Sequence, residues 1–110
     1  MIASMCVIIM RPQGEEVSTL GIRTAWANYS GAIDSNILFL EDGVYNALNN
    51  RGYNSDLLKD FIKEGGKAYC YQKSLKERGL PTANLMDGIE VISEEEVAEL
   101  IEEAESTATF

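Results

Sequence analysis

The run at residues 2–10, Ile-Ala-Ser-Met-Cys-Val-Ile-Ile-Met, constrains the fold more than any other feature of the sequence. A strand with one face in water alternates apolar and polar residues, whereas this run is almost entirely apolar. It therefore predicts a strand buried on both faces, as in parallel sheets that lie between layers of helices. The run is shorter than the ~18 apolar residues that span a membrane. Because no basic segment precedes it, we do not expect a signal peptide.

Strand and helix signals alternate along the rest of the chain. Ser55 is a candidate N-cap for one helix, and Ser93 with Glu96 forms a capping-box pattern at the start of the last. The expected order is helix 15–29, strand 37–40, short helix 44–48, helix 56–64, strand 67–71, helix 72–78, strand 89–92 and a final helix from 93. This alternation predicts a single α/β domain over residues 1–110. The expected architecture is doubly wound and flavodoxin-like, a mainly parallel sheet with helices on both faces.

The charge and residue types exclude several functions. The chain has 18 acidic and 9 basic residues, a net charge of −9, so nucleic acid and anionic membranes are poor partners. With no histidine and no C-x-x-C pattern, neither Ser-His or Cys-His catalysis nor a metal site is expected. The loop after the first strand has no phosphate-binding composition, so no flavin or nucleotide cofactor is expected. The acidic residues near the C-terminus are interpreted as a solvated helix face.

Cys70 is the candidate reactive residue, because it stands where an expected strand meets an expected helix. Amides at a helix start stabilise a thiolate, and Lys73 and Lys76 would add positive potential. The pattern thus favours a lowered pKa and faster alkylation at Cys70 than at Cys6, which lies in the middle of a buried strand. The alternative is that Cys70 is a small hydrophobic residue packed at the strand end.

A second candidate site lies at the ends of the expected strands. Asp42 follows a strand and is either a general base or a turn residue. The carboxyl ends of parallel strands form the sites of open α/β sheets. We therefore expect a pocket lined by Asp42, Gly43, Tyr45, Tyr71 and Gln72.

The helix at 15–29 carries two apolar faces. The first is expected to pack on the sheet and comprises Val17, Leu20, Gly21, Thr24 and Ala25. The second consists of Ile22, Trp26 and Tyr29 and would be exposed on a bare monomer. Either a neighbouring segment covers this second face, or it is a subunit interface of a homo-oligomer.

Three segments resemble the DsrE/DsrF-like (TusD-like) sulfur-relay family. Residues 39–48 contain Asp-Gly-Val-Tyr-Asn-Ala after a strand, residues 68–80 contain a cysteine at a strand end followed by Arg-Gly, and residues 87–93 are similar to the last strand. The resemblance implies a flavodoxin-like fold and a homo-oligomer, a trimer or a multiple of one. It also implies a persulfide carrier in which Cys70 takes sulfur from a donor protein and passes it to an acceptor thiol.

Three functions stay open from the sequence. The leading one is an intracellular, cytoplasmic sulfur carrier or sulfurtransferase subunit acting through Cys70. The second is a non-catalytic oligomeric member of the family in which Cys70 is structural. The third is a small-ligand-binding module that uses the strand-end pocket.

Overall fold

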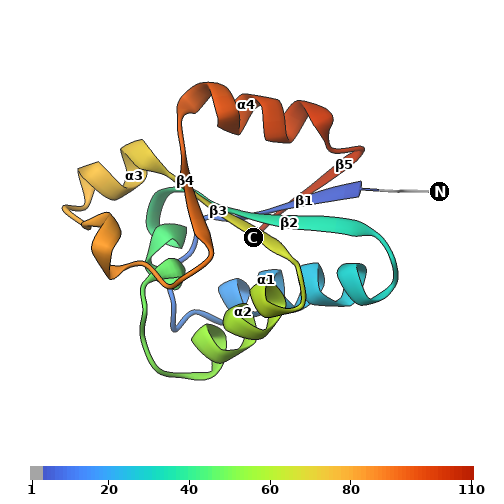
Figure 1. The fold of residues 1–110 in the computed structure, drawn as a ribbon, viewed down its shortest axis with the longest axis horizontal. Helices are drawn as coiled ribbons and strands as arrows, with labels where there is room; N and C mark the ends of the chain where they lie inside the picture. The colour runs from blue at the N-terminus through green and yellow to red at the C-terminus, as the bar shows by residue number, and fades with distance from the viewer. Residues whose placement is uncertain (1–3) are drawn as a thin grey trace.

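The computed structural model describes residues 4–110, so Ile2 and Ala3 of the expected first strand lie outside the described residues. Five parallel strands form one sheet in the order β4-β3-β2-β1-β5 (Figure 1). Their bounds are β1 Ser4–Ile9, β2 Asp34–Phe39, β3 Lys67–Tyr71, β4 Ile89–Ile92 and β5 Ser106–Thr109. The expected α/β class with helices on both faces of the sheet is confirmed.

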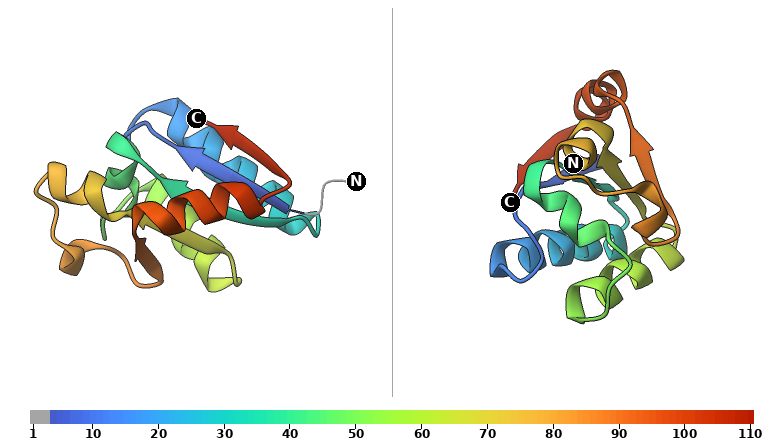
Figure 2. Two further views of the ribbon diagram at one scale, coloured as in Figure 1. Left: turned by 90° about the horizontal axis from the view of Figure 1, so that it is seen from above. Right: turned by 90° about the vertical axis from the view of Figure 1, so that its left-hand side faces the viewer.

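The topology explains which helices lie on which face. From β1 to β4 each new strand is added on the same side of the last. Right-handed crossovers place the long helices that precede β2 and β3 on one face, while the short helix that follows β3 lies at the carboxyl end of the sheet (Figure 1). β5 instead joins the other edge of β1, so the helix before it lies on the opposite face (Figures 1 and 2). The helices are α1 Glu16–Ser30, η1 Glu41–Ala47 (3₁₀), α2 Tyr53–Lys63, α3 Gln72–Glu77, η2 Thr82–Asn84 (3₁₀) and α4 Glu94–Glu103.

The two faces of the sheet bury unequal cores. The larger core lies under α1 and α2 and includes Val7, Ile37, Phe39 and Phe61. The smaller core lies under α4, and its buried members within residues 4–110 are Cys6, Ile8, Leu38 and Ile92. Successive residues of β1 point alternately into the two cores. Its sequence is therefore apolar at successive positions instead of at every second one.

β5 is a strand that the sequence pattern did not predict. Its residues Ser-Thr-Ala-Thr are short and polar, but they pair with β1, and Phe110 N–H then donates to Ile8 O at 2.8 Å. Because the strand lies at the sheet edge and is half-exposed, it lacks the apolar run on which the prediction of β1 rested.

The N-cap expected at Ser55 is wrong, whereas the capping box of α4 is confirmed. α2 begins at Tyr53 after Gly52, whose φ of 132° favours glycine, and Ser55 Oγ accepts a hydrogen bond from Gln13 Nε2 instead. At α4, Ser93 Oγ accepts from the Glu96 N–H while the Glu96 carboxylate accepts from the Ser93 N–H.

The sheet-facing side of α1 differs from the expected one. Its buried residues are Ser18, Gly21, Ile22 and Ala25, whereas Val17 and Leu20 are 40% and 48% exposed. A Cβ at position 21 would come within 2.9 Å of the side chain of Ile9, so this glycine permits close contact with the sheet.

The second apolar face of α1 is largely covered within the subunit. Ile22 is fully buried, and the rings of Trp26 and Tyr29 contact Phe61 of α2 at centroid distances of 5.9 and 5.6 Å. The Tyr29 hydroxyl also donates to Glu64 O at 2.7 Å. α2 therefore covers much of the face that suggested a subunit interface at these three α1 residues, and Trp26 and Tyr29 stay half-exposed.

Candidate functional site

Cys70 lies near the carboxyl end of β3, two residues before α3 begins, as the sequence predicted. In the sheet it stands between Phe39 of β2 and Val91 of β4. Its side chain belongs to the larger core and has no solvent exposure. The thiol therefore faces the interior and not the open end of the sheet.

Burial raises the pKa of the Cys70 thiol to about 12 and that of Cys6 to about 11. The expectation of a lowered pKa at Cys70 is wrong, because removal from water disfavours the thiolate. Lys73 and Lys76 are exposed on α3, on the outside of the molecule, and do not compensate this burial. Both cysteines are thus protonated, inaccessible thiols in this conformation.

η1 closes the carboxyl end of the sheet beside Cys70. Gly43 packs so closely on β1 that a Cβ there would overlap the backbone carbonyl of Ile9, so glycine is required for this approach. Val44 joins the same core cluster as Cys70. Glu41, at the start of η1, has a φ of 51°, a left-handed conformation that is uncommon outside glycine.

Arg78 ties η1 to α3. Its Nε donates to Asp42 Oδ1 at 2.9 Å and its Nη2 to Glu41 Oε2 at 3.3 Å. Ser74 Oγ accepts from the Glu41 N–H at 3.0 Å, which adds a second link between the two elements. Asp42 is therefore the partner of an arginine in this conformation. Arg78 was not predicted as a site residue, although the Arg-Gly of residues 68–80 was a signal for it.

The residues of the expected strand-end pocket do not gather around Cys70. Tyr71 is half-buried and, one position from Cys70 along β3, points to the opposite face of the sheet. Gln72 is exposed at the start of α3, Tyr45 is half-buried, and Gly43 is buried against β1.

A buried polar network that the sequence analysis missed fixes the other side of η1. Asn46 Nδ2 donates to Gly43 O at 3.0 Å and to Arg11 O at 2.9 Å. Asn54 of α2 donates to Ser18 Oγ at 3.1 Å and to Asn46 Oδ1 at 3.4 Å, linking α1, α2 and η1. Buried amides satisfied in this way hold a loop in one conformation. Their only sequence signal was the amide-rich segment around residues 46–54.

Two further properties hold for residues 4–110. No helix in this range has the length and apolar character needed to cross a membrane. No group of three or more acidic or cysteine side chains in the described range is arranged to hold a metal ion.

The fold and the site define a small all-parallel α/β protein with a cysteine at the end of its third strand. The chain belongs to the DsrE/DsrF-like family, whose model matches residues 3–110. It is 27% identical over 109 residues to the uncharacterized protein MJ0989 of Methanocaldococcus jannaschii, covering 94% of this chain and 96% of that protein.

Two solved structures share this fold. The ychN protein from E. coli aligns with a TM-score of 0.86 at 24% identity and complete coverage of both chains. MTH1491 from Methanobacterium thermoautotrophicum aligns with a TM-score of 0.76 at 16% identity, covering 97% of this chain and 98% of that one. At these identities the likeness establishes the fold.

Proposed function

We propose that this protein is a sulfur carrier in a relay, with Cys70 receiving sulfane sulfur as a persulfide. The observation that carries the proposal is the place of Cys70 near the end of β3, two residues before α3, in a chain of the DsrE/DsrF-like family. That family membership supports a sulfur-relay role at the family level.

The transfer needs only thiol chemistry. The Cys70 thiolate attacks the outer sulfur of a donor persulfide, R–S–SH, forming Cys70–S–SH and releasing the donor as R–S⁻. An acceptor thiolate then attacks the outer sulfur of Cys70–S–SH and leaves Cys70 as a thiolate. Each step forms one S–S bond and breaks another, so no external oxidant or reductant is consumed.

Access to Cys70 requires a movement at the closed end of the sheet. The thiol is buried, and η1 and α3 lie against the strand ends beside it. The links from Arg78 to Glu41 and Asp42 are at the surface, so they can break without unfolding the sheet. We infer that parting of η1 from α3 exposes the thiol and lets its pKa fall.

The burial of Cys70 also favours a second candidate function. In it the protein is a non-catalytic member of the family, and Cys70 only fills space between Phe39 and Val91. The two candidates differ in whether Cys70 can be loaded with sulfur while the protein remains folded.

We further propose that the working unit is a homo-oligomer, a trimer or a multiple of one, that meets donor and acceptor proteins in the cytoplasm. The exposed α1 residues Val17 and Leu20 support the proposal of self-association, because apolar side chains at a helix surface are stabilised by a partner.

The test is the intact mass of the folded protein after incubation with glutathione persulfide. One added sulfur atom on the wild type and on Cys6→Ser, and none on Cys70→Ser, is the expected result. Loading of the wild type and both variants, or of none of the three proteins, would refute the carrier function. Circular dichroism of each variant verifies that it is folded.

A further inference from the structure

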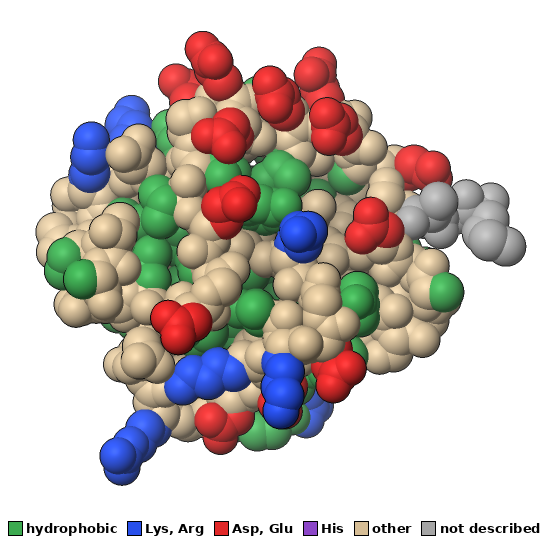
Figure 3. Space-filling view, viewed as in Figure 1, with side chains coloured by type: hydrophobic (Ala, Val, Ile, Leu, Met, Phe, Trp, Pro, Cys, Tyr) green, Lys and Arg blue, Asp and Glu red, His purple; other side chains and the backbone are tan. Residues whose placement is uncertain are grey.

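The sheet face under α4 is only partly covered. Only the connection from β4 to β5 crosses this face, so α4 is the one helix of residues 4–110 that packs there, through Val97, Leu100 and Ala104. Tyr69 of β3 lies beside this contact and stays half-exposed on the same face. Figure 3 shows apolar side chains in a hollow below the acidic side chains of α4.

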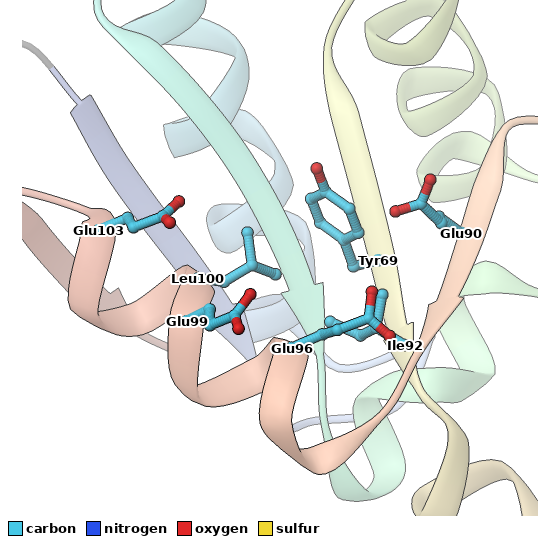
Figure 4. Close-up of a pocket in the computed structure, with 7 residues that line it drawn as sticks. All are labelled: Tyr69, Glu90, Ile92, Glu96, Glu99, Leu100 and Glu103. Carbon is cyan, nitrogen blue, oxygen red and sulfur yellow. The ribbon is translucent and has the colours of Figure 1, made fainter.

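Two adjoining hollows form one groove along α4, of about 140 and 210 Å³. They share Leu100 and Glu103. A third hollow, of about 230 Å³, adjoins the groove at Tyr69 and Glu90 but is lined elsewhere by residues of α2, β3 and the turn before β4. Figure 4 shows the ring of Tyr69 projecting between α4 and β4, with Glu90 on one side and Glu99 and Glu103 on the other. We call this surface the α4 groove; its floor is Tyr69, Ile92 and Leu100, and its rim is Glu90, Glu99 and Glu103.

The α4 groove is strongly acidic. Besides the three rim glutamates, Asp34 and Glu96 line it, and the basic residue Lys67 lines the adjoining third hollow. No rim glutamate forms an ion pair within residues 4–110. Burial, followed by the carboxylates of Glu90 and Asp34, raises the pKa of the Tyr69 phenol.

The rim glutamates are not explained by the stability of α4. Acidic residues in the first turn of a helix are stabilising, but Glu99 and Glu103 lie further along, and the last turn contains no basic residue. Glu95, Glu99 and Glu103 are also spaced four apart, where like charges repel. A cation held in the α4 groove would offset both the unfavourable negative charge near the end of the helix and the repulsion between these glutamates.

The α4 groove also offers hydrogen-bond acceptors that lack donors. Asn36, which lines one end of the groove, has an amide oxygen that is buried without a partner within residues 4–110, so an occupant would reach it only if neighbouring side chains move. Glu90, Glu99 and Glu103 are acceptor-only groups when ionised. An occupant must therefore supply N–H donors and positive charge, together with apolar side chains for the ring of Tyr69 and for Leu100.

We propose that the α4 groove binds a cationic amphipathic segment of a partner protein, with its Lys or Arg side chains at the rim and its apolar side chains on the floor. Charge complementarity selects this occupant: a second copy of this chain, also at −9, would bring further negative charge to the rim. The α4 groove lies on the sheet face opposite Cys70, so peptide binding there can be tested independently of sulfur transfer.

The experiment uses a fluorescein-labelled amphipathic peptide of lysine and leucine and follows its anisotropy as the protein is added. Salt is kept at about 0.15 M, where the Debye length of about 8 Å suppresses distant charges. Glu99→Gln/Glu103→Gln removes two rim charges, and Glu95→Gln/Glu102→Gln is the control on the same helix, outside the groove lining. Both variants change the net charge equally.

We expect the rim variant to weaken peptide binding by about fivefold or more, and the control variant by less than about twofold. Equal losses in both variants would overturn the proposal, because the peptide would then respond only to net charge. So would equal affinity for a lysine–serine peptide, which has no apolar face, or effective competition by spermine. Absence of peptide binding to the wild type would also overturn it. These conservative substitutions on an exposed helix leave the fold intact, which circular dichroism verifies.

Discussion

Replacing Arg78 by Gln is expected to increase the alkylation rate of Cys70. The arginine side chain is 17% exposed and its partners Glu41 and Asp42 are 55% and 57% exposed, so each ion pair is worth roughly 0.2–1 kcal/mol. Loss of both pairs should favour the parting of η1 from α3 by about 1 kcal/mol, which is about fivefold in the equilibrium.

The assay is iodoacetamide labelling at pH 8, with a Cys6→Ser background so that Cys70 is the single thiol. Because burial holds the pKa of Cys70 at about 12, the closed form carries almost no thiolate and the rate reports the open population. Lys76→Gln is the control, since Lys76 is an exposed cation of α3 with no ion pair within residues 4–110.

We expect the alkylation rate to rise about fivefold for Arg78→Gln, to stay unchanged for Lys76→Gln, and to be insensitive to low urea. Insensitivity to urea identifies local opening, because global unfolding exposes much more surface and depends steeply on denaturant. A rate for Arg78→Gln equal to that of the parent would refute the reasoning that these ion pairs hold η1 closed. Labelling of the folded parent as fast as that of the unfolded chain would refute the burial of Cys70.

Three further predictions concern stability. Burial raises the pKa of Cys70 to about 12 and that of Cys6 to about 11, so above pH 9 the unfolded state loses thiol protons that the folded state keeps. The free energy of unfolding should therefore fall with rising pH, by up to about 1.4 kcal/mol per pH unit for each thiol. Urea titrations from pH 8 to 10.5 should show a shallower fall for Cys70→Ala, and an unchanged slope would contradict this. Gly43→Ala should lower the free energy of unfolding by more than about 2 kcal/mol, because its Cβ meets the backbone of β1, whereas Gly31→Ala should stay within about 0.5 kcal/mol; equal effects in urea denaturation would disprove it. Trp26→Ala should cost about 2 kcal/mol by removing the contact with α2, while light scattering shows the same assembly as the wild type; dissociation would instead place Trp26 in an interface.

The strands with apolar or β-branched residues were predictable from the sequence, and the edge strand was not. β3 and β4 occupy the expected residues 67–71 and 89–92, because positions buried in the sheet require apolar residues that can be recognised in the sequence. β5 forms because the backbone of β1 supplies its hydrogen-bond partners. This pairing depends on the tertiary fold and cannot be recognised from the four small residues of β5 alone.

The candidate site was predictable in position but not in environment. The pattern located Cys70 at the end of a strand, before a helix. Whether it faces solvent depends on which side of β3 receives α1 and α2, and that follows from the crossover direction of the whole chain. The same limit applies to Trp26: periodicity identified its apolar face, but only the packing of α2 shows what covers it.

The pairing of β1 with β5 has a consequence for synthesis on the ribosome. β1 leaves the exit tunnel first, yet one of its two edges is completed by residues 106–109. Until those residues emerge, a central and very apolar strand has an open row of backbone donors and acceptors. Between the emergence of β1 and that of residues 106–109, the nascent chain is therefore prone to intermolecular strand pairing along this edge.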